Sequence, residues 1–415
     1  MWISQSIPFL EPSVGHSVSL DTTRLENHQS MTPTHSPRDY SPLVIKRVDA
    51  FCTRLPLTKP MLMAGIEIRS AENIFIRIET NNHLVGWGEA TSAPTHGGAT
   101  IEQMSSVFER LIKPFLIGED ALKLSALSSQ LMQSPDAEVS TVAAVDEALH
   151  DLVGKHLGVP AHVLLGGMRR SSVTPLWLIG TSSAEHDLEA TELKYKEGYR
   201  FFKLKLGVKS LAEDIKSTLA IKAKYGAKVR LCGDVNMGWS VAQAREYAQA
   251  THQAGVDFLE QPLHKDDHQG LKELIANTDL PICLDEAITS TDDIVYAANE
   301  RTKGVSLKTL KFAGMGGVCA AGHLCSGLGL NINLSGKVAE SGVGAAALLQ
   351  ISAALPNVNW GVSPSHLFLA EDVLTHAVQP VEGQYVISTL PGLGIEVNEQ
   401  IIEKYLIKQG TMSHD

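Results

Sequence analysis

The segment FFKLKLG, residues 201–207, places two lysines in one short apolar strand. Successive side chains of a strand point to opposite faces, so Lys203 and Lys205 share a face. Buried ammonium groups need nearby anions, which carboxylates of the protein, a bound anionic substrate, or both would supply. The proximity of the two lysines should also lower a lysine pKa toward the range where it acts as a base. An exposed edge strand is the alternative interpretation.

Seven similar segments surround this one in the chain. After Gly167, short apolar strands alternate with helical segments, as a parallel sheet covered by crossover helices requires. Eight strands at this spacing predict a (β/α)8-type barrel, and no GxGxxG motif supports a dinucleotide-binding fold. The expected strands are 174–180, 201–207, 228–236, 257–262, 280–286, 304–311, 330–336 and 357–363.

Charged residues recur near the carboxyl ends of these strands, where barrel enzymes place catalytic groups. After Lys205 come Asp234, Glu260, Asp285 and Lys308, at steps of 29, 26, 25 and 23 residues, about one βα unit each. Three carboxylates from neighbouring strands, without His or Cys, favour Mg²⁺ or Mn²⁺ over zinc. Separate solvated acids are the alternative, but a surface pattern has no reason to repeat once per strand.

Lys308 lies four barrel units beyond Lys205. The two ammonium groups can therefore approach a substrate from opposite sides. Lys311 is a competing candidate, but we prefer Lys308 because a residue three positions later has left the strand. A metal beside a substrate carboxylate would neutralise the charge that develops when the α-proton leaves, and a lysine would take that proton.

The chain before the barrel has a different pattern. Residues 1–42 are rich in Ser, Thr, Pro and His and predict a loose extension, and translation from Met31 is an alternative start. Strand-like segments then meet at Asn81-Asn82, a predicted hairpin, and helical patterns follow at 99–116 and 140–158. The first 165 residues therefore predict an α+β domain.

Composition narrows the class of partner. The net charge of −11 and the lack of a Lys/Arg run argue against nucleic acid and anionic membranes. No apolar run reaches the roughly 18 residues of a membrane span, and the first 20 residues lack the features of a secretory signal. Five scattered cysteines suggest reduced thiols and a cytoplasmic protein. We expect a small-molecule partner.

Taken together, these motifs resemble the enolase superfamily and, within it, the muconate-lactonizing-enzyme subgroup. The resemblance implies a (β/α)7β modified TIM barrel with an α+β N-terminal capping domain. We expect the domains 1–42 (extension), 43–165 (cap), 166–375 (barrel) and 376–415, which the resemblance assigns to a return to the cap. The motifs that carry it are VGWGEA (85–90), AVDEALHDLVGKHLGVPAHVLLGG (144–167), FFKLKLG (201–207), GDVNMGW (233–239), LEQPL (259–263), CLDE (283–286), SLKTLK (306–311) and AESGVGAAALLQ (339–350).

The resemblance also assigns roles. It implies a small-molecule carboxylate substrate and a homo-oligomer, and it makes Asp234, Glu260 and Asp285 the Mg²⁺ ligands. Lysines on both sides argue against the mandelate racemase and acid-sugar dehydratase branches, which use a His-Asp pair. The implied catalytic and supporting residues are Lys205 and Lys308 as the acid/base pair, with Lys203, Asn236 and Glu286.

Substrate specificity in such enzymes comes from cap loops, here 55–65 and 92–98, and from the ends of the last strands. Dipeptide epimerases carry Asp-x-Asp at the eighth strand, where this chain has WGVSPSH (360–366), so a dipeptide is disfavoured. Lys337 would pair with a second substrate carboxylate or, equally, face solvent. The candidates for specificity are Lys59, Met61, Met63, His96, Lys337, Glu340 and Ser363.

Several reactions share this set of residues. The first expectation is a cycloisomerase acting on a muconate-like unsaturated dicarboxylate. The second is a racemase or epimerase of an N-substituted amino acid, or a related lyase or synthase such as o-succinylbenzoate synthase. A catalytically retired binding protein is a hypothesis from another class, and the complete catalytic set argues against it.

Overall fold

A parallel barrel forms the larger part of the structure. A computed structural model describes residues 42–63, 66–94, 98–180 and 183–407. One sheet has the strand order β5 to β12, and the amide of Leu176 donates to the carbonyl of Val362 at 2.7 Å, which joins its first and last strands. The strands are β5 (Trp177–Ile179), β6 (Phe201–Lys205), β7 (Arg230–Asp234), β8 (Leu259–Glu260), β9 (Ile282–Leu284), β10 (Gly304–Leu307), β11 (Asn331–Ser335) and β12 (Val362–Ser363).

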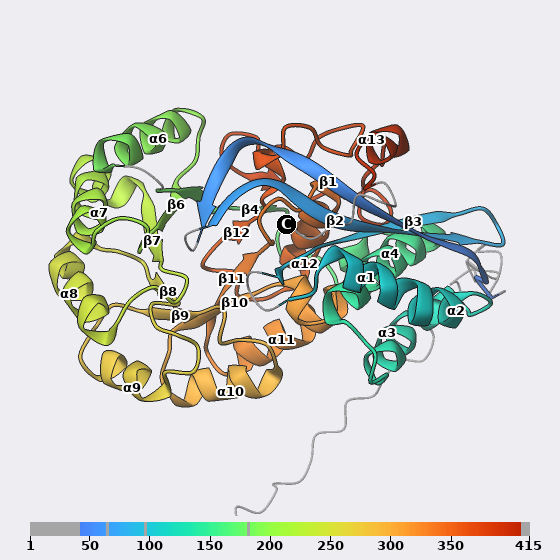
Figure 1. The fold of residues 1–415 in the computed structure, drawn as a ribbon, viewed down its shortest axis with the longest axis horizontal. Helices are drawn as coiled ribbons and strands as arrows, with labels where there is room; N and C mark the ends of the chain where they lie inside the picture. Colours follow the sequence, from blue (N-terminus) through green and yellow to red (C-terminus); the bar gives the residue numbers. More distant parts are fainter. Residues whose placement is uncertain (1–41, 64–65, 95–97, 181–182, 408–415) are drawn as a thin grey trace, which may run out of the picture. The chain divides into compact units, whose positions relative to one another are not determined.

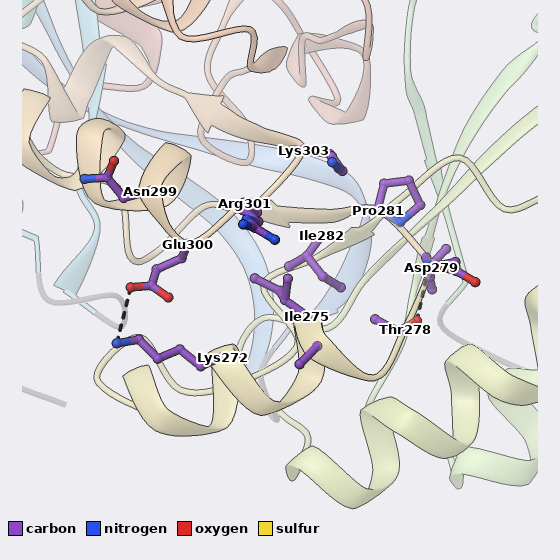
Figure 2. Close-up of a pocket in the computed structure, with 12 residues that line it drawn as sticks. Lys272, Ile275, Thr278, Asp279, Pro281, Ile282, Asn299, Glu300, Arg301 and Lys303 are labelled. Carbon is purple, nitrogen blue, oxygen red and sulfur yellow. Dashed lines mark hydrogen bonds and ion pairs between the residues drawn. The ribbon is translucent and has the colours of Figure 1, made fainter. Parts of the chain in front are cut away.

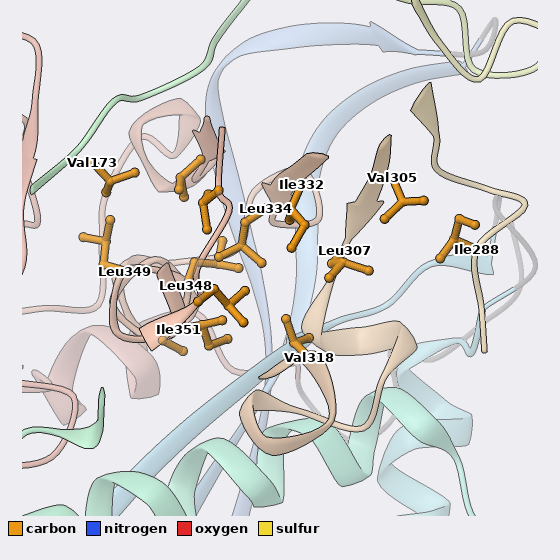
Figure 3. Packing of buried hydrophobic residues seen from close by; sticks show 14 of the residues in the cluster. Val173, Ile288, Val305, Leu307, Val318, Ile332, Leu334, Leu348, Leu349 and Ile351 are labelled. Carbon is orange, nitrogen blue, oxygen red and sulfur yellow. The ribbon is translucent and has the colours of Figure 1, made fainter. Parts of the chain in front are cut away.

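Helices cover the outer side of the barrel strands (Figure 1). Most begin at a Ser or Asp whose side chain accepts a hydrogen bond from the first helical turn, as Ser210 does for α7. Outward side chains of β10 and β11, such as Leu307 and Leu334, lie against Val318 and Leu348 (Figure 3). The helices are α6 (Ala184–Lys196), α7 (Leu211–Tyr225), α8 (Val241–Thr251), α9 (His268–Ala276), α10 (Thr291–Asn299), α11 (Met315–Gly327) and α12 (Gly342–Ala354).

The N-terminal domain is an antiparallel sheet with helices. Strands β1 (Ile45–Met63), β2 (Ile66–Thr80) and β3 (Val85–Thr91) pair in that order, and β2 and β3 meet at the turn Asn81-Asn82. Its helices are α1 (Ile101–Val107), α2 (Lys113–Leu116), α3 (Leu124–Met132), α4 (Val139–Leu157) and α5 (Ala161–Leu164), with a π-helical segment between α1 and α2 at Phe108–Ile112.

The C-terminal part of the chain contacts both regions. Strand β13 (Tyr385–Val386) pairs with β4 (Ser172–Val173), and after helix α13 (Glu399–Lys404) Leu406 forms an antiparallel bridge with Thr53 of β1. The segment that follows β12 also meets β1, because Leu57 bridges Leu369. The long first strand is therefore held at two places by segments that follow the barrel.

The fold agrees with the sequence in its main features. The barrel, the hairpin and the two helical regions are confirmed, although the predicted helix at 99–116 contains the π-helical segment. Residues 1–41, with Met31, lie outside the described part of the chain. The five cysteines are free thiols, and no described helix is both long and apolar enough to cross a membrane.

Three buried carboxylates join the N-terminal domain to barrel helices and the C-terminal segment. Glu89 of β3 accepts hydrogen bonds from the amides of Ser341 and Gly344 at the start of α12. Asp146 of α4 accepts from the amide of Gly316 at the start of α11, and Asp151 accepts from the amide of Leu393 at 2.9 Å. Since the first amides of a helix lack partners within it, acids from another element satisfy them.

Two glycines of the motif VGWGEA allow β3 to lie directly on α4. A Cβ atom at Gly88 would lie 2.0 Å from the carbonyl oxygen of Ala144, and one at Gly86 would lie 2.2 Å from that of Ala148. No side chain fits between the strand and the helix backbone at these points. This close packing places Glu89 beside the barrel.

We expect Gly88→Ala to lower the free energy of unfolding by about 1–3 kcal/mol, because the added methyl group overpacks a rigid backbone contact. Urea unfolding measures the effect. Gly327→Ala is the matched control, since a Cβ there meets no atom within 4 Å, and its change should stay within about 1 kcal/mol. Equal stability of the two variants would contradict the packing argument.

Candidate active site

Five neighbouring strands bring charged side chains of both signs to one end of the barrel. Lys205 ends β6 and pairs in register with Asp234 at the end of β7, which pairs with Glu260 at the end of β8. Asp285 follows β9 by one residue, and Lys308 follows β10 by one residue. The structure thus brings together all five residues that the spacing singled out, and the three acids lie between the two lysines in the strand order.

Ion pairs hold this cluster together. The Nζ of Lys205 lies 2.7 Å from Oδ2 of Asp234, and that of Lys308 lies 2.6 Å from Oδ2 of Asp285. Lys203 lies 2.5 Å from Oε2 of Glu260. The acids and both lysines of β6 are at most 5% exposed, so these pairs are shielded from water.

Lys311 is a residue whose contact the sequence did not indicate. It lies in the 3-10 turn Thr309–Lys311 and reaches back to Oδ1 of Asp285 at 2.8 Å, while Lys308 holds Oδ2. It has indeed left the strand, as expected, but the turn returns its ammonium group to the site. The repeated lysine in SLKTLK (306–311) was the only signal for it.

The pKa shifts follow the local charges. Burial opposes the charge on Lys203, but the carboxylates of Glu260 and Asp234 outweigh it and raise its pKa. The prediction that lysine proximity lowers this pKa is therefore wrong for Lys203, because its opposite charges dominate. Burial also opposes the charge on Lys308, and Asp285 again reverses the effect and raises the pKa.

Asn236 and Glu286 extend the cluster on the side of Lys205. Asn236 has a left-handed backbone (φ 46°), and its side-chain oxygen accepts a hydrogen bond from Lys205. Its amide group donates to Glu286 at 3.0 Å. Burial and the charges of Asp285 and Asp234 raise the pKa of Glu286 to about 7, and its Oε2 is buried without a hydrogen-bond partner.

The donor set suits a divalent cation. Burial raises the pKa of Glu260, and the neighbouring Asp234 and Asp285 raise it further despite Lys203, so negative charge is concentrated here. Within the described ranges, no three His, Cys, Asp or Glu side chains are grouped to hold a metal as they stand. The carboxylates face lysines instead. Their oxygen chemistry and shared location fit a hard cation such as Mg²⁺.

The specificity candidates fall into two groups. At the ends of β11 and β12, Glu340 is buried, Lys337 is half-buried, and the Oγ of Ser363 is buried without a hydrogen-bond partner. On β1, Lys59 is exposed and Met61 packs against the barrel core. His96 and the side chain of Met63 lie outside the part of the chain that the structure describes.

Glu340 belongs to a group of buried glutamates whose proximity the sequence did not indicate. Its Oε1 accepts a hydrogen bond from the amide of Lys337 at 2.8 Å, while Oε2 is buried without a hydrogen-bond partner. Burial and the charge of Glu89 raise the pKa of Glu340 to about 8. Burial, then Glu340 and Glu89, raise the pKa of Glu147 well above its ordinary value. A protonated Glu340 is therefore available as a hydrogen-bond donor at neutral pH.

Two surface cavities lie elsewhere on the barrel. One of about 530 Å³ is lined by Pro281, Ile282, Arg301 and Lys303, at the amino ends of β9 and β10 (Figure 2). It therefore opens at the end of the strands opposite the acids. A second cavity of about 330 Å³ is lined by residues that include His268 and Tyr296 of α9 and α10.

Comparison with family models shows to which family this chain belongs. The model "Enolase C-terminal domain-like" matches residues 187–401, about half of the chain. The model "Mandelate racemase / muconate lactonizing enzyme, N-terminal domain" matches residues 46–166. This chain belongs to the enolase superfamily. Enzymes of the superfamily generally use a divalent metal and act on small-molecule carboxylates.

Superfamily relatives of known activity include different isomerases. Muconate cycloisomerase 1 of Rhodococcus opacus is 28% identical over 368 residues, which are 88% of this chain and 98% of that protein. L-Ala-D/L-Glu epimerase of Bacillus subtilis (strain 168) is 28% identical over 354 residues, covering 85% and 96%. These relatives place the chain among the isomerases of the enolase superfamily.

A solved structure of the same superfamily has the same architecture. The crystal structure of muconate lactonizing enzyme from Pseudomonas fluorescens, complexed with muconolactone, matches with a TM-score of 0.84 at 26% identity. The match covers 88% of this chain and 100% of that one. The barrel with an α+β N-terminal domain is therefore the fold of the muconate-lactonizing-enzyme subgroup, as the sequence motifs implied.

The raised pKa of Glu340 predicts how stability depends on pH. A carboxyl group with a folded pKa of about 8 and an ordinary value of 4.5 contributes stability at low pH, which is lost as pH rises toward 8. We expect Glu340→Gln to remove this loss, so the free energy of unfolding of the variant relative to wild type should increase between pH 5 and pH 8.

Urea unfolding at several pH values measures the difference. Glu246→Gln, which changes an exposed glutamate of α8, is the control and should follow the wild-type curve. If the Glu340→Gln curve also ran parallel to that of wild type, Glu340 would not carry the extra proton in the folded state.

Proposed function

We propose that this chain transfers a proton at the carbon next to a substrate carboxylate, with Lys205 and Lys308 as the acid/base pair. The observation that carries the proposal is the order lysine, aspartate, glutamate, aspartate, lysine along strands β6 to β10. Two proton-transfer groups thus flank one set of acids. We assign Asp234, Glu260 and Asp285 as ligands of Mg²⁺ or Mn²⁺.

Charge balance supports an anionic substrate. Four lysines (203, 205, 308 and 311) face four acids (234, 260, 285 and 286), so the cluster is close to neutral when all are charged. A bound divalent cation would supply Lewis-acid stabilisation for the charge that develops on the substrate carboxylate. The added positive charge also favours binding of that carboxylate.

The lysines perform the proton transfer from fixed positions. Asp234 and Asn236 orient Lys205, while Asp285 orients Lys308 on the other side of the acids. A group held in place can take a proton from one face of the α-carbon or deliver one to it. Protonated Glu340, near Lys308, is suited to donate a hydrogen bond to a substrate oxygen as negative charge develops there.

Cycloisomerisation of a muconate-like unsaturated dicarboxylate is the preferred net reaction. The similarity to muconate cycloisomerase 1 and to the muconolactone complex supports it. Racemisation or epimerisation of an N-substituted amino acid is the second candidate. The lysines on both sides favour it, because inversion of a carbon requires proton transfer at two faces, and an epimerase is among the relatives.

Lys337 is our leading specificity residue. It follows β11 at the same end of the barrel as the acids and is half-buried, so it is not a fully solvent-facing side chain. Burial, together with the charges of Lys308 and Lys205, lowers its pKa to about 8. We propose that it pairs with a second carboxylate of the substrate.

The proposed reaction requires a divalent metal and both lysines. In a screen of carboxylate libraries, turnover should disappear after thorough chelation and return with Mg²⁺ or Mn²⁺. Lys205→Ala and Lys308→Ala should each lower kcat by about 10²–10⁴-fold, whereas the exposed Lys216→Ala should not. Loss of diene absorbance identifies cycloisomerisation, and deuterium uptake from solvent into an amino-acid derivative identifies racemisation. Activity that survives chelation would overturn the metal assignment.

Lys337→Met should raise the KM for a dicarboxylate substrate by about tenfold, the equivalent of one partly exposed charge contact of about 1.4 kcal/mol. The KM for a matched monocarboxylate should change little. Steady-state kinetics with both substrates measures this, and Lys303→Met, at the opposite end of the barrel, is the control. An unchanged dicarboxylate KM would show that Lys337 does not contact the second carboxylate.

A further inference from the structure

Neutral side chains inside the barrel hold both oxygens of Glu260. The hydroxyl of Ser306 donates to Oε1 at 2.8 Å, and the amide group of Asn333 donates to Oε2 at 3.4 Å. Lys203 also contacts Oε2. Glu260, Ser306 and Asn333 are each at most 1% exposed, so water does not compete for these contacts.

The two neutral donors come from neighbouring strands in register. Ser306 of β10 is the direct partner of Asn333 of β11. Alternation along β10 turns Ser306 toward the barrel interior, while Leu307 points to the helices (Figure 3). Asn333 is itself oriented, because the hydroxyl of Ser335 donates to its side-chain oxygen at 2.9 Å. The result is a group of neutral polar side chains beside Glu260.

Glu260 differs from the other two acids in how it is held. Lys308 and Lys311 hold the two oxygens of Asp285, and Asp234 is held by Lys205 and by the amide of Asn236 at 3.2 Å. Glutamate has one more rotatable bond than aspartate, so fixing its carboxylate costs more conformational entropy. Ser306 and Asn333 restrict that rotation without adding positive charge, which would oppose a cation.

We propose that Ser306 and Asn333 are positioning residues that hold the carboxylate of Glu260 ready to bind the divalent cation. The inference rests on the metal assignment of the proposed function. Outer partners of metal ligands commonly change metal affinity by about 10–100-fold when removed. These residues act through Glu260 and need not touch the substrate.

Titration of the metal-free protein with Mn²⁺, followed by electron paramagnetic resonance of the free ion, tests the proposal without any substrate. We expect Ser306→Ala to raise the Kd for Mn²⁺ by about tenfold or more and Asn333→Leu to raise it by a smaller factor, because its contact is longer. Ser306→Thr keeps the hydroxyl group and should restore affinity to within about threefold of wild type.

The control variant is Ser352→Ala, which removes a buried serine hydroxyl of α12 that bonds only to its own helix. It should leave the Kd unchanged. Unfolding midpoints measured without metal show whether a variant has lost its fold. If Asn333→Leu does not fold, the comparison of Ser306→Ala with Ser306→Thr decides the question alone.

The outcomes separate this inference from the proposed function. Wild-type protein that binds no Mn²⁺ would refute the metal assignment and, with it, this role. A second outcome is that wild-type protein binds Mn²⁺ and Ser306→Ala, folded as judged by its unfolding midpoint, binds it equally well. That result would refute the positioning role only. Weaker binding by both Ser306→Ala and Ser306→Thr would also contradict it, since the hydroxyl would then not be the cause.

Discussion

The barrel of this protein depends on compensation of buried charge. Burial opposes the charges of Lys203 and Lys308, and their pairs with Glu260 and Asp285 stabilise these charges by mutual attraction. Partners in these pairs are 23 to 57 residues apart in the chain, so only the parallel register of β6 to β10 brings them together. The ion pairs of the site therefore depend on the same strand pairing that forms the barrel.

The same use of buried carboxylates connects the N-terminal domain to the barrel. Glu89 and Asp146 satisfy the first amides of α12 and α11, the two helices that follow β11 and β10. The charge of Glu89 raises the pKa of Glu340, whereas the charge of Lys308 lowers it. Because the close packing at Gly88 leaves no room for a side chain, the domain contact that carries Glu89 is tightly determined.

The sequence predicted the elements and site residues that recur at regular spacing along the chain. It missed the contacts between residues that follow no regular spacing. Regular steps along the chain identified Asp234 and its neighbours because each βα unit has a similar length. Lys311 was undervalued because a 3-10 turn reverses its direction, which spacing does not reveal. Ser306 and Asn333 are neutral residues in apolar strands and resemble ordinary interior positions. The direction of the pKa shift of Lys203 did not follow from the sequence, because spacing does not show that Glu260 and Asp234 act on Lys203 more strongly than Lys205 does.

The proposed catalytic groups and the candidate specificity residues come from different parts of the barrel. The proposed proton-transfer and metal groups come from β6 to β10, whereas Lys337 and Ser363 come from β11 and β12, next to segments that contact β1. The two sets lie on different strands of the same barrel. Substitutions at the ends of β11 and β12 leave the ion pair of Lys205 with Asp234 in place, since these two residues come from β6 and β7. The charges of Lys337 and Lys205 nevertheless act on each other. In the proposed site, substrate selection and proton transfer therefore depend on different residues, which remain coupled through the charge of Lys337.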